Sequence, residues 1–338
     1  MQTASIGVFG ASGYSGLELT RLLARHRGVS LRFLTSDRWV GQSVAARAGV
    51  ASLLAYVSVA EGVRQAEGCD SILLATPAES SLELVPALRA RGIRVVDLAG
   101  AFRLKQASAY PEFYRFEHAA PALLTEAVYG IPELFRRETK GRALIANPGC
   151  FATVAALTLA PLLRAGLIDT EGLVINAASG VSGAGRKASE EFGFMEIDGD
   201  FRAYRVLSHQ HTPEIEQTLT AVAGATVSVV FTPHLLPIKR GILCTSVAKL
   251  KKGVSAKQVT AAFIDQFGGE KLIGLQASPE AVRIADVVNT PGCAIGVASN
   301  AHHVVSTGAL DNLLKGAASQ AIQNLNLQLG FDEYEGLL

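Results

Sequence analysis

The chain has 338 residues, of which 49% are hydrophobic and 18% charged, and its formal net charge is +1. That length allows about two domains with sizeable cores, and the composition excludes a largely disordered chain. The balanced charge, without long basic runs, gives no support for binding nucleic acid or a membrane surface, so we predict neither as a partner. The N-terminus lacks a signal-like pattern, no apolar run reaches membrane-spanning length, and the 4 cysteines show no paired or metal-ligand spacing. We therefore predict a cytoplasmic protein without a metal site.

Strand and helix patterns alternate through residues 1–149. The strands are expected at 6–9, 29–34, 71–75, 93–96 and 143–146, and the helices at 17–25 and 79–91. Continuous apolar strands separated by helices are typical of a parallel sheet that is covered on both faces. We therefore predict an α/β fold with a Rossmann-type domain over residues 1–149.

Beyond residue 166 the strand patterns lengthen and the helical patterns become fewer. Strands are expected at 173–177, 226–231 and 242–247. This texture predicts a second domain over residues 150–310, an α+β catalytic or dimerisation domain with a mixed sheet. The period of residues 311–329 predicts a final helix, and we expect segment 311–338 to complete the first domain.

A glycine-rich loop follows the first predicted strand and opens the first predicted helix. Glycines three residues apart permit a tight turn in which helix N–H groups can approach a pyrophosphate. The strand–turn–helix context favours a dinucleotide site over a purely structural turn. The predicted cofactor-binding residues of this loop are Gly10, Ser12, Gly13, Tyr14, Ser15 and Gly16.

The end of the second predicted strand bears on the choice of cofactor. Ser36 and Arg38 favour a ribose 2′-phosphate, whereas Asp37 between them would favour a free 2′-hydroxyl. We predict NADP rather than NAD, with Ser36 and Arg38 as binding residues.

A single thiol, Cys150, follows the turn Asn147-Pro148-Gly149 and precedes an apolar run. A cysteine at a helix N-terminus faces unpaired N–H groups and the positive end of the helix dipole, both of which favour the thiolate. We predict that Cys150 is a nucleophile. The alternative, a small buried hydrophobe, is the better interpretation of Cys69, Cys244 and Cys293.

Two histidines precede a helix-start signal at Thr212-Pro213. Histidine is suited to proton transfer near neutral pH, so His209 and His211 are acid–base candidates. The alternative is that one or both are surface or capping residues. A Gly-rich loop over 179–187 ends in two cations and could bind an anion, or could be a flexible surface loop. The anion-binding candidates are Ser182, Gly183, Arg186, Arg103 and Arg240.

A thiol, a dinucleotide loop, a histidine and an anion-binding loop together indicate the chemistry of a phosphorylating aldehyde dehydrogenase. The chain resembles the N-acetyl-gamma-glutamyl-phosphate reductases of arginine biosynthesis over nearly its whole length. The resemblance rests on GASGYSG at 10–16, NPGC at 147–150, SGVSGAGRKA at 179–188, HQHTPEIEQ at 209–217, FTPHLLPIKRGI at 231–242 and DNLLKGAASQAIQNLN at 311–326.

That resemblance implies that Cys150 is the nucleophile, that His209 is its acid–base partner and that Asn312 lies near the nicotinamide. It implies NADPH-dependent reduction of N-acetyl-L-glutamyl 5-phosphate, a small-molecule acyl phosphate, to the 5-semialdehyde through a cysteine thioester. It also implies a homodimer or a homotetramer.

Departures from the family pattern fall on the substrate side. The family usually has Asp-Leu-Ser-Ala-Asp-Phe-Arg at 97–103, Tyr at Phe151 and a different segment at 289–296. An N-succinyl, carrier-linked or aminoadipyl phosphate therefore stays open as the substrate. An aspartate-semialdehyde or glyceraldehyde-phosphate type dehydrogenase and a catalytically silent NADP sensor are two competing interpretations of the whole chain. The NPGC and HQHTPEI motifs disfavour the former, and retention of both Cys150 and His209 disfavours the latter.

Overall fold

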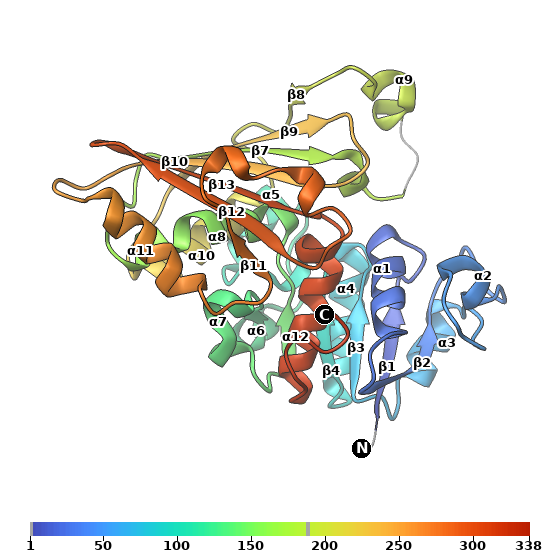
Figure 1. Cartoon of the computed structure of the whole chain (residues 1–338). Coiled ribbons are helices and arrows are strands. Elements are labelled where there is room, and N and C mark those ends of the chain that lie inside the picture. The colour runs from blue at the N-terminus through green and yellow to red at the C-terminus, as the bar shows by residue number, and fades with distance from the viewer. Residues whose placement is uncertain (1–2, 187–189) are drawn as a thin grey trace. The chain divides into compact units, whose positions relative to one another are not determined.

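The computed structural model describes residues 3–186 and 190–338. Contacts divide the chain into two compact units, which Figure 1 shows with their element labels. The first unit runs to Pro148 and resumes at Ala317, and the second runs from Gly149 to Gly316. The chain therefore passes between the units just before Cys150 and again just after Gly316.

The first unit contains a parallel sheet with the strand order β2-β1-β3-β4-β6-β5. Its strands are β1 (Ala4–Phe9), β2 (Val29–Leu34), β3 (Ser71–Leu74), β4 (Arg94–Asp97), β5 (Val128–Tyr129) and β6 (Leu144–Ala146). Its helices are α1 (Tyr14–Leu23), α2 (Val44–Ala48), α3 (Val59–Gln65), α4 (Ala78–Ala90), α5 (Tyr110–Phe113), α6 (Pro121–Glu126), α7 (Pro132–Thr139) and α12 (Ser319–Leu329). The predicted Rossmann-type sheet is confirmed, and β5 is a strand that the sequence patterns missed.

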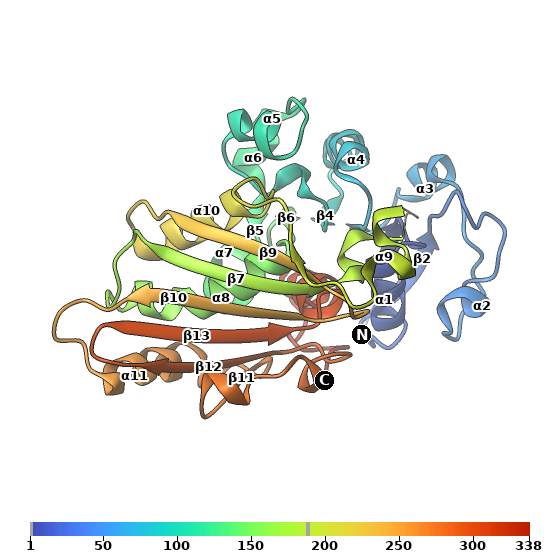
Figure 2. The same cartoon turned by 90° about the horizontal axis from the view of Figure 1, so that it is seen from above.

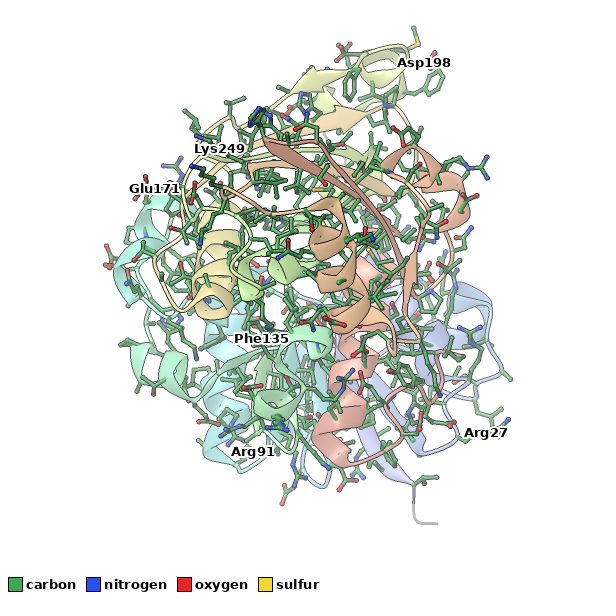
Figure 3. The ribbon with its side chains drawn as sticks, turned by 60° about the vertical axis from the view of Figure 1, so that its left-hand side comes forward. Arg27, Arg91, Phe135, Glu171, Asp198 and Lys249 are labelled. Atoms are coloured by element: carbon green, nitrogen blue, oxygen red, sulfur yellow. The ribbon has the colours of Figure 1, made fainter. Side chains whose placement is uncertain are left out.

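Helices cover both faces of this sheet, which explains why its strands are apolar runs. The aromatic side chains of Phe9 and Phe33 pack with α3 and α4 on one face. Helices α1 and α12 pack together on the other face, as Figures 1 and 2 show. Charged side chains such as Arg27 and Arg91 lie at the surface (Figure 3).

The C-terminal helix begins later than the expected helix over 311–329. Asp311 and Asn312 form a turn, a π-helical segment follows at Leu314–Ala318, and α12 starts only at Ser319. The Asp311 carboxylate accepts hydrogen bonds from the N–H groups of Leu313 and Leu314, and such bonds compete with regular helix. The contact boundary between the units accordingly falls at Gly316, five residues after Asp311.

The second unit contains a mixed sheet with the order β11-β12-β13-β10-β7-β9-β8. Its strands are β7 (Leu173–Gly180), β8 (Arg202–Ala203), β9 (Val229–Leu236), β10 (Ile242–Lys249), β11 (Ile273–Leu275), β12 (Cys293–Ser299) and β13 (His303–Leu310). Its helices are α8 (Cys150–Arg164), α9 (Phe194–Ile197), α10 (Thr212–Ala223) and α11 (Ala256–Phe267). Strand β7 pairs in parallel with β9 and antiparallel with β10, which confirms the predicted mixed sheet.

Short 3-10 turns complete the two units, at Gly100–Phe102, Ala107–Ala109, Val181–Ala184, Glu190–Phe192, Pro279–Ala281 and Ile284–Asp286. The strand expected at 226–231 was misplaced, because β9 continues through Pro233 to Leu236. Pro233 is tolerated because β9 lies close to the edge of the sheet. Among the described strands, only β8 lies beyond it in the sheet, and β8 is 2 residues long.

Helix α8 determines where the thiol lies. Its residues from Phe151 to Leu163 are all buried, so the helix is covered on every side and forms the core of the second unit. With α10 and α11 it lies on one face of the mixed sheet (Figures 1 and 2). A helix held this firmly presents its first residue, Cys150, in a fixed place.

Candidate active site

The thiol of Cys150 stands at the first position of α8, where Gly149 is the N-cap residue. Cys150 is half-buried, whereas the other three cysteines are buried, and all four are free thiols. The Gly149 N–H donates a hydrogen bond to Glu214 Oε2 on α10, at 3.0 Å. The predicted position at a helix N-terminus is therefore present, and the turn before it is fixed by a buried carboxylate.

Gly149 is required by the ring beside it. A Cβ atom at this position would lie 2.3 Å from His211 Nε2, which is closer than real Cβ atoms approach. His211 Nε2 in turn lies 3.9 Å from Glu214 Oε1, and the Glu214 side chain is fully buried. Gly149, His211 and Glu214 thus form one cluster next to the thiol.

His209 is buried and electrically neutral near pH 7. Burial, followed by the charges of His211 and Arg205, lowers its pKa from 6.5 to about 2. Its Nδ1 accepts a hydrogen bond from the His211 backbone N–H at 3.1 Å, so the neutral ring carries its proton on Nε2. The ring packs edge-to-face against Phe151 and Phe231.

Both histidines are buried, with 5% of His209 and 7% of His211 exposed, which excludes the surface interpretation. Their ring centroids are 4.8 Å apart. The sequence patterns could not show which of the two histidines is the acid–base residue, because the two rings differ only in their tertiary contacts. His211 contacts Gly149 before the thiol and Phe151 after it, whereas His209 contacts Phe151 and Phe231.

The sequence patterns missed Glu214, which belongs to this cluster, and Tyr204, which lies near it. Burial raises the pKa of Tyr204, and the nearby Cys150 raises it further, so the phenol lies within electrostatic range of the thiol. The signal of Glu214 in the sequence is only that of an ordinary acidic residue in the first turn of a helix, which is common for electrostatic reasons.

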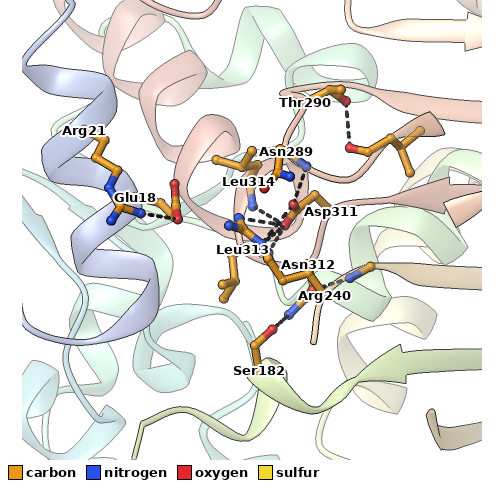
Figure 4. Close-up of polar contacts among 12 residues, drawn as sticks. Glu18, Arg21, Ser182, Arg240, Asn289, Thr290, Asp311, Asn312, Leu313 and Leu314 are labelled. Atoms are coloured by element: carbon orange, nitrogen blue, oxygen red, sulfur yellow. Dashed lines mark hydrogen bonds and ion pairs between the residues drawn. The ribbon is translucent and has the colours of Figure 1, made fainter. Parts of the chain in front are cut away.

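The predicted anion loop is held by the turn that follows β13. Asn312 Nδ2 donates to Ser182 Oγ at 2.9 Å, and Asn312 Oδ1 accepts from the Gly241 N–H at 2.8 Å. Arg240 pairs with Asp311, with 3.1 Å between Nε and Oδ2. Figure 4 shows these side chains converging on the end of β13. Ser182, Arg240 and Asn312 are thus brought together.

Of the other candidates, Gly183 follows Ser182 on the same loop, where a Cβ would lie 3.9 Å from Asn312 Nδ2. Arg186 is half-buried, Gly183 is exposed, and Lys187 falls outside the described residues. Arg103 belongs to the first unit, where its Nε donates to the Asn147 carbonyl at 2.8 Å and a terminal nitrogen donates to the Leu98 carbonyl at 2.5 Å. The roles of these arginines toward a substrate, and that of Asn312 toward a cofactor, stay predictions.

The glycine-rich loop between β1 and α1 has the tight geometry that the dinucleotide motif requires. Gly10 has φ +75°, and a Cβ there would lie 2.3 Å from the Ala75 carbonyl oxygen. A Cβ at Gly16 would lie 2.3 Å from the Gly10 carbonyl oxygen. Gly13 is the N-cap of α1, so the backbone N–H groups of the first turn can meet a pyrophosphate.

The residues after β2 are those predicted to meet the ribose of the cofactor. The Asp37 carboxylate accepts the Val59 N–H at the start of α3, at 3.1 Å. Ser36 is buried and its hydroxyl accepts from the Trp39 N–H, while Arg38 is exposed. One oxygen of the Asp37 carboxylate is therefore engaged with α3, and the side chains of Asp37 and Arg38 are both exposed.

Neither a metal-binding cluster nor a membrane-spanning helix occurs in the described part of the chain. Across residues 3–186 and 190–338, no group of three or more histidine, cysteine or acidic side chains could hold a metal ion. Within the same residues, no helix is long and apolar enough to cross a membrane.

A parallel-sheet unit with a dinucleotide loop, joined to a mixed-sheet unit with a thiol at a helix N-terminus, defines an oxidoreductase of the semialdehyde dehydrogenase class. Family models agree: residues 5–142 match the semialdehyde dehydrogenase NAD binding domain, and residues 150–312 match the semialdehyde dehydrogenase dimerisation domain. The fold is similar to that of aspartate semialdehyde dehydrogenase II from Vibrio cholerae, with TM-score 0.78 and 18% identity over 98% of this chain and 99% of that chain. It is also similar to an aspartate semialdehyde dehydrogenase with NADP from Candida albicans, with TM-score 0.70 and 13% identity over 96% and 98% of the two chains.

Relatives in sequence are more specific. The chain is 41% identical to the N-acetyl-gamma-glutamyl-phosphate reductase of Symbiobacterium thermophilum, over 99% of this chain and 98% of the relative. The reductases of the same name from Magnetococcus marinus and Moorella thermoacetica are 40% and 42% identical, over 99% and 97% of this chain and 97% and 96% of theirs. The chain belongs to the N-acetyl-gamma-glutamyl-phosphate reductase family.

Proposed function

We propose that this chain reduces N-acetyl-L-glutamyl 5-phosphate with NADPH to N-acetyl-L-glutamate 5-semialdehyde and phosphate, in L-arginine biosynthesis. The observation that carries the proposal is the placement of Cys150 at the start of α8, in a turn fixed by Glu214 and His211. Relatives that match nearly the whole chain bear the name of this reaction. An N-succinyl, carrier-linked or aminoadipyl phosphate would use the same chemistry and is kept as a substrate in the test below.

The first unit would hold the cofactor. The N–H groups around Ser12, Gly13, Tyr14 and Ser15 would meet the pyrophosphate, and Ser36 and Arg38 would meet the 2′-phosphate. Bound NADPH would supply the hydride that reduces the thioester carbon.

Cys150 would perform the covalent chemistry. Its thiolate attacks the acyl carbon, the bond from that carbon to the phosphate oxygen breaks, and a thioester and free phosphate result. After reduction, the carbon–sulfur bond breaks, the aldehyde leaves and the thiolate is restored. The positive end of α8 favours the thiolate at both stages.

We propose different tasks for the two histidines. A proton on Nε2 lets the neutral His209 donate to the oxygen that becomes negative during attack. Accepting a second proton at Nδ1 would break the hydrogen bond from the His211 N–H, so His209 is a poor acceptor of the thiol proton. His211, which lies beside Gly149 and Glu214, would take that proton. This divides between two rings the acid–base role that the resemblance gives to His209 alone.

Arginines would hold the anionic ends of the substrate. Arg240 and Ser182 lie on neighbouring loops of the second unit, and Gly183 and Arg186 follow on the same loop as Ser182. Arg103 is the candidate in the first unit. Guanidinium groups suit this task because they bind phosphate and carboxylate with paired donors.

The test is phosphate-dependent reduction of NADP by N-acetylglutamate semialdehyde, followed at the nicotinamide absorbance band. We expect activity in the wild type, none in Cys150→Ser, and near wild-type activity in Cys69→Ser, whose thiol is buried in the first unit. N-succinyl and aminoadipate semialdehydes tested alongside should react more slowly. A wild-type rate in Cys150→Ser would refute the nucleophile.

The histidine assignment is tested by pH–rate profiles of His209→Ala and His211→Ala. We expect His211→Ala to move the acidic limb of the profile, since it removes the proton acceptor. His209→Ala should lower the rate at every pH without moving that limb. The reverse pattern would exchange the two roles.

We further propose a cytoplasmic homo-oligomer, a dimer or a tetramer. The matched dimerisation family supports assembly, and four free cysteines suit a reducing compartment. The sheet face opposite α8 presents half-buried or exposed side chains such as Val174, Val230 and Val247 and is our candidate interface. Light scattering on the purified protein should give a mass of two or four chains, and a monomer would contradict this part of the proposal.

A further inference from the structure

The carboxylate of Asp311 is the centre of a buried polar cluster at the end of β13. The residue is fully buried, and its two oxygens accept from the Arg240 guanidinium and from three backbone N–H groups. Those N–H groups belong to Asn289 at 2.8 Å, Leu313 at 2.8 Å and Leu314 at 3.2 Å. Figure 4 shows these contacts meeting at one side chain.

One branch of this cluster leads to a predicted substrate-binding residue. Arg240 approaches Asp311 through both Nε and a terminal nitrogen, at 3.3 and 3.2 Å from Oδ1. Its side chain is 20% exposed, while that of Asp311 is not exposed at all. A guanidinium held by two of its nitrogens has little freedom to rotate, so the carboxylate fixes the direction of the remaining part of the fork.

The other branch leads to the nucleophile. The side-chain bonds to Leu313 and Leu314 start the π-helical turn, and the Gly316 N–H donates to the Asp311 carbonyl at 2.9 Å. Gly316 packs directly on the thiol residue: a Cβ there would lie 2.7 Å from the Cβ of Cys150. Short π-helical turns often mark functional sites, because they aim backbone groups that a regular helix could not.

We propose that Asp311 is a positioning residue for the reaction: its carboxylate orients Arg240 toward the anionic substrate, and its turn holds Gly316 against Cys150. The inference rests on the proposed function, since Arg240 is given its substrate there. A purely structural ion pair would need only one of these branches. Asp311 joins both, so a single buried charge would couple substrate binding to the placement of the thiol.

Two substitutions separate the branches. Asp311→Asn keeps an oxygen that can accept from Leu313 and Leu314 but removes the charge that orients Arg240. Asp311→Ala removes both. The matched control is Asp286→Asn. This substitution breaks an exposed ion pair in the same unit, in which Asp286 Oδ1 lies 2.6 Å from a terminal nitrogen of Arg283. Circular dichroism and the unfolding temperature confirm that each variant is folded.

Two measurements report on the branches. The first is KM against kcat for phosphate and for the semialdehyde in the direction of NADP reduction. The second is the rate at which iodoacetamide alkylates Cys150, followed by peptide mass spectrometry. The cycle of Arg240→Gln, Asp311→Asn and the double variant tests whether Asp311 acts through Arg240.

We expect Arg240→Gln to raise either the KM for phosphate or the KM for the semialdehyde about tenfold or more, which is the size of the effect of a lost charged hydrogen bond. Asp311→Asn should raise the same KM, the double variant should be little worse than either single one, and Cys150 alkylation should stay near the wild-type rate. Asp311→Ala should also change the alkylation rate several-fold. Asp286→Asn should change neither the KM values nor the rate at which Cys150 is alkylated.

The inference and the proposed function fail in different ways. If Arg240→Gln raises a KM but Asp311→Asn leaves it unchanged, or if the two effects simply add, Asp311 does not position Arg240. An Asp311→Ala variant that is folded and alkylated at the wild-type rate would overturn the second branch. If Arg240→Gln alters no KM, the substrate role given to Arg240 is wrong instead.

Discussion

At the level of single residues, His209 and His211 differ in their protonation behaviour because they contact different groups. His209 accepts from a backbone N–H and is held neutral by burial. His211 lies against Gly149 and 3.9 Å from a buried carboxylate. The pattern around a histidine in a sequence contains neither fact, which is why the motif indicated acid–base chemistry without identifying the ring.

Glu214 offers a direct test of this cluster. Glu214→Gln keeps an acceptor for the Gly149 N–H but removes the negative charge beside His211, so kcat should fall about tenfold, the effect of about 1.4 kcal/mol. Glu216→Gln is the control, since Glu216 stands on the same helix and accepts a backbone N–H from Val229 at 3.1 Å. Steady-state kinetics measure kcat for both variants, and equal kcat values would contradict a role for the Glu214 charge.

His209 also makes stability depend on pH. Its pKa is about 2 when folded and near 6.5 when unfolded, so the unfolded chain binds more protons below pH 6.5. The stability that comes from keeping this ring neutral is present above pH 6.5 and is lost as the pH falls, by at most about 1.4 kcal/mol per pH unit.

Urea unfolding at pH 7.5 and pH 5.5 measures this dependence. Wild type should lose about 1 kcal/mol more than His209→Gln over that interval. The exposed residue His303 provides the control variant, His303→Gln, which should follow the wild type. Identical pH dependence in His209→Gln and wild type would show that His209 is protonated freely in the folded state.

At the scale of elements, the apolar strands of the first unit and the start of α8 could be predicted because their signals are local. The turn at Asp311 and the extension of β9 through Pro233 could not, because each depends on a partner distant in sequence. The same holds for the candidate site. Cys150 is recognisable from its helix start, whereas Glu214, Tyr204 and Asp311 acquire their roles only through tertiary contacts.

The turn before α8 provides the prediction at this scale. Gly149→Ala would place a Cβ 2.3 Å from His211 Nε2, so the ring or the turn must move. We expect a loss of about 1–3 kcal/mol of stability, as for overpacking, and a fall of at least about tenfold in kcat. The control is Gly269→Ala, where a Cβ would meet nothing within 4 Å. A Gly149→Ala enzyme with wild-type kcat would show that the close fit at this turn is not needed.

At the scale of the whole molecule, each unit contains a buried titratable group, and the two groups respond to pH in opposite directions. Acid weakens the second unit through His209. In the first unit, burial raises the pKa of Asp97 to about 7, although Ser81 and the Ala99 N–H bind one of its oxygens. The folded state then holds a proton that the unfolded chain releases above about pH 4, so stability falls as the pH rises from 4 to 7.

Asp97→Asn should therefore stabilise the first unit, by about 1–3 kcal/mol at pH 8 and by much less at pH 4.5. The control is Asp70→Asn, since Asp70 is exposed and accepts the Ser5 N–H at 2.7 Å. Thermal unfolding followed by circular dichroism at the two pH values measures the difference. A gain of equal size at both pH values would mean that Asp97 does not titrate in this range.

In the proposed reaction, Cys150 carries the acyl group. The most direct measurement is peptide mass spectrometry of the protein without NADPH, quenched in acid shortly after mixing with N-acetylglutamyl phosphate. We predict an N-acetylglutamyl thioester on the peptide that contains Cys150 and on none of those with Cys69, Cys244 or Cys293. An active enzyme that forms no adduct on Cys150, or forms it on another residue, would show that Cys150 is not the nucleophile.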